Sequence, residues 1–169
     1  MTDRKDEPPR EATGQNVKLL IELLKLASII SRPMKEAVAD PHGLSTSELR
    51  VLMCLAGEGP LAGQDISKIM SIPPMNVSRA LAVLDLRGWT EQAPDQGNRR
   101  RRPVQLSKAG WKAYRAMIPD VQLVARRLFA SLEREERQHL AHIFNRLIAQ
   151  VEAWDFVAGP AATRNKSPD

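Results

Sequence analysis

Apolar residues recur at helical spacing through most of the chain, and this pattern predicts a mainly helical fold. From Asn16 to about Ala39 the apolar positions recur at helical intervals, as they do on one face of a helix. Pro33 lies inside this run, so we expect it to kink or interrupt the helix, and residues 40–43 then end it. The apolar positions are Val17, Leu20, Ile21, Leu24, Ala27, Met34 and Val38.

Two shorter helices are predicted next. The first extends to about Ala56; Ser45 or Thr46 can cap it, and Glu48 lies in its first turn. The second covers roughly Gly63–Met70, and Ala62 at its capping position has no side-chain oxygen to cap it. The residues of this short helix expected to face inward are Ile66, Ile69 and Met70.

A fourth helix is predicted from about Pro74 to Arg87, directly after the turn at residues 71–74. Proline suits the first helical position because its missing N–H would have no partner there. At about 100° per residue, one face of this helix is apolar and the opposite face is centred on Arg79. The apolar face consists of Val77, Ala80, Leu81 and Leu84, and the flanks of Arg79 are Met75, Asn76, Ala82 and Val83.

A basic hairpin follows this helix. A strand-like segment over residues 89–93 leads through a polar turn at 94–98 into four consecutive arginines, and the chain returns over residues 103–106. Two short strands that are joined by a basic loop directly after a helix describe a winged helix. The arginines are Arg99, Arg100, Arg101 and Arg102, and their mutual repulsion favours a solvated loop with a polyanionic partner.

Two long helices are predicted after the hairpin. Ser107 is a plausible cap for the first, and Pro119 should bend it; the second runs from Glu133 to about Val157. Their apolar stripes lie outside the winged-helix unit, so we expect these helices and the first helix to bury apolar faces together at a two-fold interface. The stripes are Trp111, Tyr114, Ile118, Val121, Ala125 and Leu128, and then Leu140, Ile143, Phe144, Leu147, Ile148, Val151 and Trp154.

The positive charge is concentrated in one loop. The formal net charge is +5, and residues 94–108 carry five basic residues against one acidic residue. A generally basic protein would spread this charge over its surface. The concentration of charge beside a helix-turn-helix pattern is typical of a nucleic-acid contact, and DNA is the expected partner.

Composition and motifs exclude several other classes. A single cysteine, Cys54, rules out an internal disulfide framework, and its apolar neighbours indicate a buried, inert thiol. No apolar run is long enough to span a membrane, and the charged start of the chain is unlike a secretory signal, so we expect a bacterial-type cytoplasmic protein. Phosphate-loop, nucleophile-elbow and zinc-protease motifs are absent, so neither an enzyme nor a cofactor is expected. The three histidines, His42, His139 and His142, are too few and too scattered to predict a metal site.

In this order and spacing the segments resemble the MarR family of transcriptional regulators over roughly residues 16–157. Asn76–Arg79 is similar to the family's T-V-S/T-R segment on the recognition helix, and Gly88-Trp89 to the start of its wing. Leu106–Gly110 matches the L-T/S-x-x-G opening of the next helix. There are two departures: Asn98 stands where the family has an aspartate that braces the wing arginine, and Pro73 replaces a polar cap.

The resemblance implies a homodimeric repressor that binds double-stranded DNA at a pseudo-palindromic operator. It also implies release of the DNA by a small aromatic or phenolic effector. Four residues could border the pocket for this effector, or could instead serve only packing and surface charge: Trp89, Trp111, Met53 and Arg50. The alternative is a winged-helix module that binds an acidic protein partner through its arginines, and Arg79 could instead form an ion pair with Asp85. The candidate DNA contacts are Asn76, Ser78, Arg79, Arg99, Arg100, Arg101, Arg102 and, as a phosphate contact, Lys68.

These expectations divide the chain into five parts. The central part is the DNA-binding unit, the parts on either side of it are dimerisation helices, and the two ends are mobile tails. In chain order the parts are a tail over residues 1–13, an N-terminal dimerisation helix over 14–44, a winged helix-turn-helix over 45–106, C-terminal dimerisation helices over 107–158, and a tail over 159–169.

Overall fold

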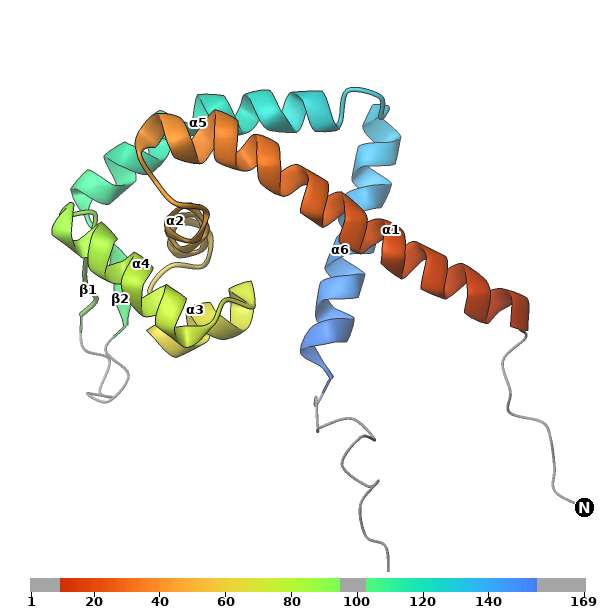
Figure 1. The fold of residues 1–169 in the computed structure, drawn as a ribbon, viewed down its shortest axis with the longest axis horizontal. Helices are drawn as coiled ribbons and strands as arrows, with labels where there is room; N and C mark the ends of the chain where they lie inside the picture. The colour runs from red at the N-terminus through yellow and green to blue at the C-terminus, as the bar shows by residue number, and fades with distance from the viewer. Residues whose placement is uncertain (1–9, 95–102, 155–169) are drawn as a thin grey trace, which may run out of the picture. The chain divides into compact units, whose positions relative to one another are not determined.

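The computed structural model describes residues 10–94 and 103–154, which form helices and one β-hairpin (Figure 1). The predicted fold class, mainly α with a small hairpin wing, is confirmed. The chain divides into two compact units, Met1–Ala125 and Arg126–Asp169. The elements are α1 (Arg10–Met34), the π-helix η1 (Lys35–Ala39), the 3-10 helix η2 (Asp40–His42), α2 (Thr46–Glu58), α3 (Gly63–Met70), α4 (Pro74–Leu86), β1 (Thr90–Gln92), β2 (Val104–Leu106), α5 (Lys108–Leu128) and α6 (Arg134–Glu152).

Helix α1 differs from its prediction at both ends. It begins at Arg10, within the segment expected to be a mobile tail. It also continues through Pro33 to Met34, and the interruption follows as the π-helix η1, in which the N–H of Asp40 donates to the carbonyl of Lys35. Because proline has no N–H, it leaves a gap in the helical hydrogen-bond ladder, and the wider π-turn follows directly after it.

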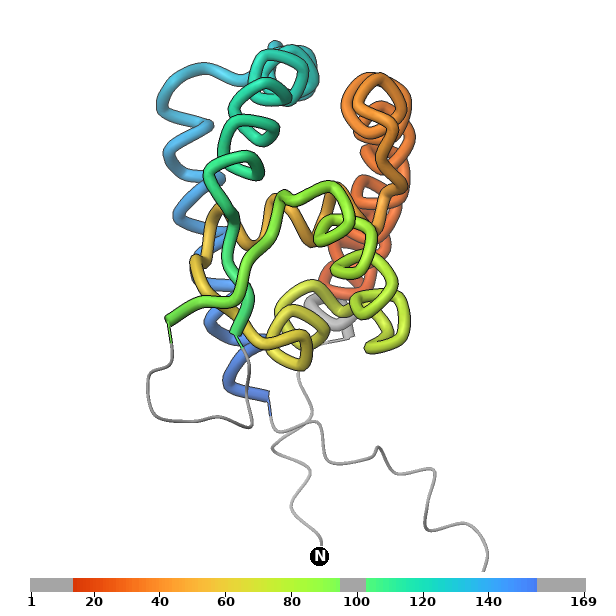
Figure 2. The backbone as a smooth tube through the Cα atoms, turned by 90° about the vertical axis from the view of Figure 1, so that its left-hand side faces the viewer, coloured from red at the N-terminus to blue at the C-terminus, as the bar shows by residue number. Residues whose placement is uncertain are grey.

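Helix α2 is the centre of the first unit. Its predicted cap is confirmed: Ser45 Oγ accepts from the N–H of Glu48 at 3.3 Å, and the Glu48 carboxylate accepts from the N–H of Ser45 at 2.9 Å. The helix contacts α3, α4, β2 and η1, and Figure 2 shows the short helices grouped around one another with the hairpin beside them. The residues that α2 buries are Leu49, Val51, Leu52, Cys54 and Leu55.

Helices α3 and α4 complete the core, with one misplaced side chain. The predicted bounds of α3 are confirmed, and Ile66 is buried as expected, but Ile69 is 50% exposed and the prediction that it points inward is wrong. Ile69 lies about 60° round the helix from Ile66, and the narrow contact face of an eight-residue helix does not reach that far. Helix α4 ends at Leu86, with Arg87 as its C-terminal cap.

The hairpin is shorter than predicted and gains a third backbone partner. Strands β1 and β2 pair antiparallel, with Thr90 opposite Leu106 and Gln92 opposite Val104. Leu61 extends the sheet, because its N–H donates to the Val104 carbonyl at 3.0 Å and its carbonyl accepts from the Val104 N–H at 2.8 Å. This pairing, which the sequence pattern did not predict, attaches the hairpin to the segment just before α3.

Close backbone packing joins α5 to the start of the hairpin. Ser107 caps the helix as predicted: its Oγ accepts from the N–H of Gly110 at 3.0 Å and donates to the Gly88 carbonyl at 2.6 Å. A Cβ at position 110 would collide with the carbonyl oxygen of Trp89. Position 110 therefore requires glycine, and position 88, with φ of +68°, favours it.

The buried stripe of α5 differs from the predicted stripe. The buried residues are Gly110, Met117 and Val124, and Trp111, which was expected on the apolar face, is 37% exposed. Tyr114 and Val121 are shared by both stripes and are partly buried against the core. Pro119 lies inside the helix, and α5 changes direction along its length as expected (Figure 1).

Helix α6 lies in the second unit and buries none of its residues. Glu133 precedes it in a capping box with Glu136, whose carboxylate accepts from the N–H of Glu133 at 2.7 Å. The helix ends at Glu152, before the predicted end near Val157; Ala153 is its C-terminal cap, and the N–H of Trp154 donates to the Val151 carbonyl three residues back. Its exposed large hydrophobic side chains are Ile143, Leu147, Ile148 and Val151, followed by Trp154.

Candidate nucleic-acid interface

A short, well-anchored turn joins α3 to α4. Ser71 closes α3 in the left-handed conformation, with φ of +48°. Ser67 Oγ donates to the Ile72 carbonyl at 2.6 Å, and the Arg50 guanidinium donates to the Met70 carbonyl. Ile72 itself is buried. These contacts fix the angle between the two helices, which together form a helix-turn-helix.

Helix α4 has one buried face and one exposed face. Val77, Ala80 and Leu84 are buried against α2 and α3. At its start, Pro73 provides no side-chain cap, and its carbonyl instead accepts from the N–H groups of Asn76 and Val77 at 2.9 and 3.2 Å. The sequence predicted both the missing side-chain cap and the direction of the buried face.

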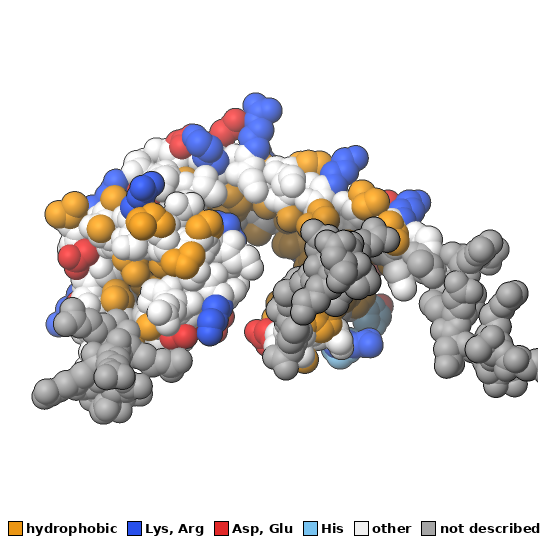
Figure 3. All heavy atoms as spheres, turned by 60° about the horizontal axis from the view of Figure 1, so that its bottom comes forward, with side chains coloured by type: hydrophobic (Ala, Val, Ile, Leu, Met, Phe, Trp, Pro, Cys, Tyr) orange, Lys and Arg blue, Asp and Glu red, His pale blue; other side chains and the backbone are white. Residues whose placement is uncertain are grey.

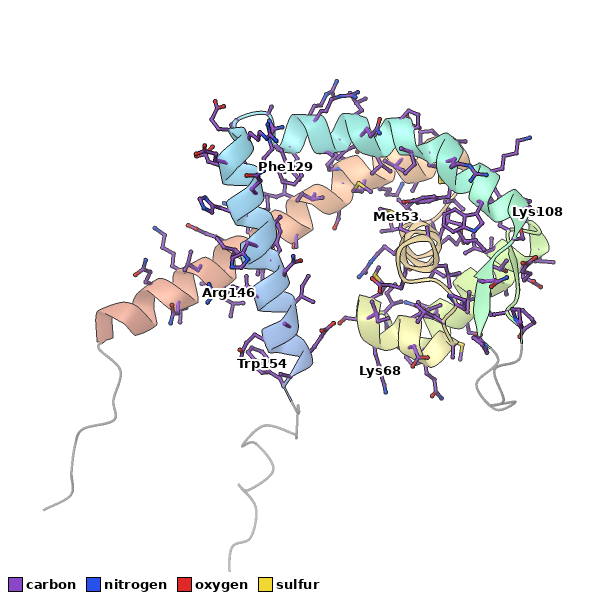
Figure 4. The ribbon with its side chains drawn as sticks, turned by 180° about the vertical axis from the view of Figure 1, so that it is seen from behind. Met53, Lys68, Lys108, Phe129, Arg146 and Trp154 are labelled. Atoms are coloured by element: carbon purple, nitrogen blue, oxygen red, sulfur yellow. The ribbon has the colours of Figure 1, made fainter. Side chains whose placement is uncertain are left out.

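The predicted recognition residues lie on the exposed part of this helix. Asn76, Ser78 and Arg79 are all exposed. Arg79 forms neither a hydrogen bond nor an ion pair with any residue that the structure describes, so the expected alternative, pairing with Asp85, is not seen. Lys68 on α3 is exposed, and Figure 4 shows it extending away from the helices around it. The structure therefore brings these four polar or basic side chains to the surface of one helix-turn-helix.

The arginine loop falls outside the described residues. Asn98 and all four predicted wing contacts, Arg99, Arg100, Arg101 and Arg102, belong to residues 95–102. The described residues on either side of this loop are hydrogen-bonded to each other: the N–H of Ala93 donates to the Pro103 carbonyl at 2.9 Å. The contacts predicted for these arginines remain predictions.

A contact set around Arg87 was not predicted. The Arg87 guanidinium donates to the carbonyls of His42 and Gly43, at 3.2 and 2.6 Å, and lies over the Trp89 ring at 5.0 Å from its centroid. His42 Nε2 in turn lies 2.9 Å from Asp120 Oδ2 on α5. The end of α4 and the start of the hairpin are therefore linked to the segment before α2 and to α5. These partners are far apart in sequence, so no local pattern could reveal them.

Cys54 is buried in the core of α2. Burial, with a smaller contribution from the nearby Glu58 carboxylate, raises the pKa of its thiol above the ordinary value. Because the thiolate is the reactive form, this environment suppresses oxidation and metal binding. The geometry supports the prediction of an inert cysteine.

The other candidate ligand-binding residues have different surroundings. Arg50 is engaged with the α3 terminus, Met53 on α2 is half-buried, and Trp111 stacks edge-on with Tyr114 at 5.9 Å between ring centroids. Within residues 10–94 and 103–154, no three His, Cys, Asp or Glu side chains are grouped closely enough to hold a metal ion. No helix over the same residues is long and apolar enough to cross a membrane.

A shallow groove lies between the first turns of α3 and α4. Its volume is about 360 Å³, and Gln64, Ser78 and Pro74 are among the residues that line it. Gln64 and Ser78 both line the groove, so Gln64 lies on a surface that includes one of the predicted recognition residues. The sequence analysis did not single out Gln64, because a lone glutamine at a helix start carries no distinctive pattern.

Comparison with known proteins finds a family model that matches the helix-turn-helix and the first strand of the hairpin. Residues 42–101 match the sequence model of the MarR family. An uncharacterized HTH-type transcriptional regulator, YwoH of Bacillus subtilis, is 24% identical over 135 residues, which cover 80% of this chain and 97% of the relative. The HTH-type transcriptional repressor NicR of Pseudomonas putida is 24% identical over 143 residues, which cover 85% of this chain and 88% of the relative.

Solved structures share the fold. A MarR-family transcriptional regulator from Silicibacter pomeroyi has a TM-score of 0.67 at 22% identity and covers 79% of this chain and 89% of its own. A mutant MarR from E. coli complexed with operator DNA has a TM-score of 0.63 at 19% identity, and the match covers 79% of this chain and 95% of the E. coli chain. BpsR of Bordetella bronchiseptica, whose DNA binding is regulated by 6-hydroxynicotinic acid, has a TM-score of 0.63 at 19% identity, and the match covers 77% of this chain and 98% of the BpsR chain.

Proposed function

We propose that this chain binds double-stranded DNA and represses transcription as a homodimer. Its residues 42–101 match the model of the MarR family of transcriptional regulators. The observation that carries this proposal is the exposed face of α4, where Asn76, Ser78 and Arg79 are free to meet DNA while the opposite face packs in the core. Such a regulator acts on chromosomal DNA in the cytoplasm and needs no catalytic chemistry of its own.

The recognition helix enters the major groove and the hairpin lies beside it on the DNA backbone. Arg79 can offer two donors to one guanine, and Asn76 can pair with adenine. Lys68 and Arg99–Arg102 are assigned to phosphates or to the minor groove at the edge of the site, where they set affinity and register rather than sequence choice. Gln64, next to Ser78 in the groove between α3 and α4, extends this polar surface.

A second copy of the chain supplies the other half of the DNA contact. Eight large hydrophobic side chains of α1 are exposed, and α6 exposes four more, so both helices offer apolar faces that a partner can cover. Two related recognition helices then meet successive major grooves about one DNA turn apart, which implies a pseudo-palindromic operator. The exposed residues of α1 are Val17, Leu19, Leu20, Ile21, Leu23, Leu24, Leu26 and Ile29.

We further propose that a small aromatic or phenolic acid releases the DNA. The support is the similarity to BpsR, whose DNA binding responds to 6-hydroxynicotinic acid. The contacts of Arg87 and His42 give such a molecule a route to act, since they connect α5 with the end of α4. A ligand that shifts α5 would change the spacing of the two recognition helices.

The salt dependence of binding to a duplex selected from genomic DNA tests the main proposal. We expect a steep fall in affinity with salt, and we expect the double variant Arg99→Ala with Arg100→Ala to flatten the log–log slope by about 0.9 for each phosphate that it no longer neutralises. Arg79→Ala should weaken binding roughly 10- to 100-fold, because it removes a bidentate hydrogen bond to a base. The control is Arg115→Ala, which removes an exposed arginine of α5 and should change neither quantity. Unchanged binding by both wing and α4 variants would refute these contact assignments, and a wild type that binds no duplex would instead favour the module that binds an acidic protein.

A further inference from the structure

The exposed face of α4 is more apolar than DNA binding by arginine and asparagine requires. Positions 75, 79, 82 and 86 are spaced four, three and four residues apart, so they share the face opposite Val77, Ala80 and Leu84. Three of these four positions are apolar. Met75 is 63% exposed and Leu86 is 87% exposed. Hydrophobic side chains lie among the polar ones on the exposed surface of the molecule (Figure 3).

Met75 is not a core residue displaced from its place. The core contacts of α4 are already made by Val77, Ala80 and Leu84, which lie on the other side of the helix. Met75 is the second residue of α4, one turn before Arg79. The N-terminal residues of a recognition helix are those that reach base edges, so Met75 stands where base contacts are made.

The major groove offers one apolar group to such a side chain. Among the four base pairs, only thymine places a methyl group there. Methionine is unbranched and flexible, so it can follow the position of that methyl while Arg79 and Asn76 hold polar edges nearby. Leu86 lies about 16 Å further along the helix, too far to share the same base pair.

We propose that Met75 is a specificity-determining residue that packs on the 5-methyl group of a thymine in each half-site. This inference rests on the proposed DNA-binding function and deepens it. Two exposed basic side chains of the helix-turn-helix, Arg79 on the same face and Lys68 on α3, favour a polyanionic occupant over an apolar protein surface. The site therefore reads at least one base pair by shape and apolar contact.

The test replaces single thymines by deoxyuridine in the selected duplex, which removes only the methyl group. Wild-type affinity should fall about fourfold at one thymine position per half-site, as expected for one buried methyl. Met75→Ala should lose a similar factor on the thymine duplex and become insensitive to deoxyuridine at that position. Leu86→Ala, the matched control on the same face, should keep the wild-type sensitivity.

Two outcomes separate the inference from the function on which it rests. If the wild type binds the duplex with a steep salt slope but Met75→Ala keeps full sensitivity to deoxyuridine, or no thymine position is sensitive, then the methyl contact is refuted and DNA binding stands. If the wild type binds no duplex, the proposed function fails as well. Because Met75 is exposed, its replacement should leave the thermal unfolding midpoint unchanged, and a drop in that midpoint would also contradict the assignment.

Discussion

Helices α2 and α1 differ in what becomes of their apolar side chains. Of the 13 residues of α2, five apolar ones are buried, and Leu52 and Val51 are fully inaccessible. In α1 eight large hydrophobic residues between Val17 and Ile29 stay exposed, and they occur all round the helix rather than on one stripe. A helix that is hydrophobic all round is normally buried. Helix α2 is therefore packed within one chain, whereas α1 leaves apolar side chains exposed that the proposed homodimer would cover.

The same contrast separates the two functions that we assign. The winged helix-turn-helix has its own core and exposes Asn76, Ser78 and Arg79 on α4, which suits a DNA-binding unit. Helices α1 and α6 expose large apolar side chains and bury none of their described residues, which suits association between copies. In the proposed dimer, association would place two DNA-binding units on one duplex.

The largest effect is expected from truncating α2. Leu52→Ala should lower the free energy of unfolding by about 3 kcal/mol, because it opens a cavity in a close-packed core. Leu20→Ala on α1 should lower stability by an amount that varies with protein concentration, since its exposed side chain would be covered only in the proposed dimer. Urea unfolding at several protein concentrations measures both. A loss for Leu20→Ala that did not vary with concentration would mean that α1 packs within its own chain.

Gly110→Ala should have the next largest effect. The added Cβ meets the Trp89 carbonyl oxygen, so α5 must move away from the hairpin at a cost of about 2 kcal/mol. Gly57→Ala is the matched control, since its Cβ on α2 would meet nothing within 4 Å. Thermal unfolding should show a lower midpoint for the first variant and an equal or higher midpoint for the second. Equal midpoints for both variants would show that α5 does not depend on this close approach.

Arg87→Ala should cost about 1 kcal/mol, because it removes hydrogen bonds to the His42 and Gly43 carbonyls at a partly solvated site. Arg87→Lys should recover part of this loss, since an ammonium group can reach one carbonyl but not both. Differential scanning calorimetry gives the ranking. A lysine variant as unstable as the alanine variant would indicate that stacking on Trp89, rather than the hydrogen bonds, stabilises the end of α4.

The smallest effect is expected at Cys54. Because burial raises the pKa of its thiol, the thiolate is scarce near neutral pH, and dilute hydrogen peroxide should change duplex affinity less than about twofold. The thiol should react readily once the protein is unfolded in urea, which provides the control. Loss of DNA binding that a thiol reductant reverses would overturn this assignment and make α2 a redox sensor.

The sequence predicted those parts of the structure that depend on local spacing. The bounds of α3, the cap at Ser45 and the buried face of α4 follow from periodicity and capping rules that operate within a few residues. The wrong or missing predictions concern burial and strand pairing that depend on segments far apart in the sequence. Ile69 and Trp111 fit a helical stripe but remain 50% and 37% exposed, and the pairing of Leu61 with Val104 joins residues with no common pattern.

The same distinction between local and long-range features applies to the candidate site. Exposure of Asn76, Ser78 and Arg79 followed from the angular position of each residue on one helix, so it could be predicted. The contacts of Arg87 with His42 and Gly43 depend on how four elements fold together, so they could not. The exposure of Met75 followed from its angular position too, but only the structure shows that Val77, Ala80 and Leu84 already fill the core contacts of α4.

The stoichiometry of the protein on a selected operator duplex tests the central claim most directly. Sedimentation or native mass spectrometry of the full chain with that duplex should find two chains per duplex, and footprinting should show two protected half-sites about 10 base pairs apart. Replacing Leu20 and Leu24 together by glutamate should yield monomers that bind the same duplex far more weakly. A single wild-type chain bound per duplex, with affinity unaffected by those α1 substitutions, would contradict the account.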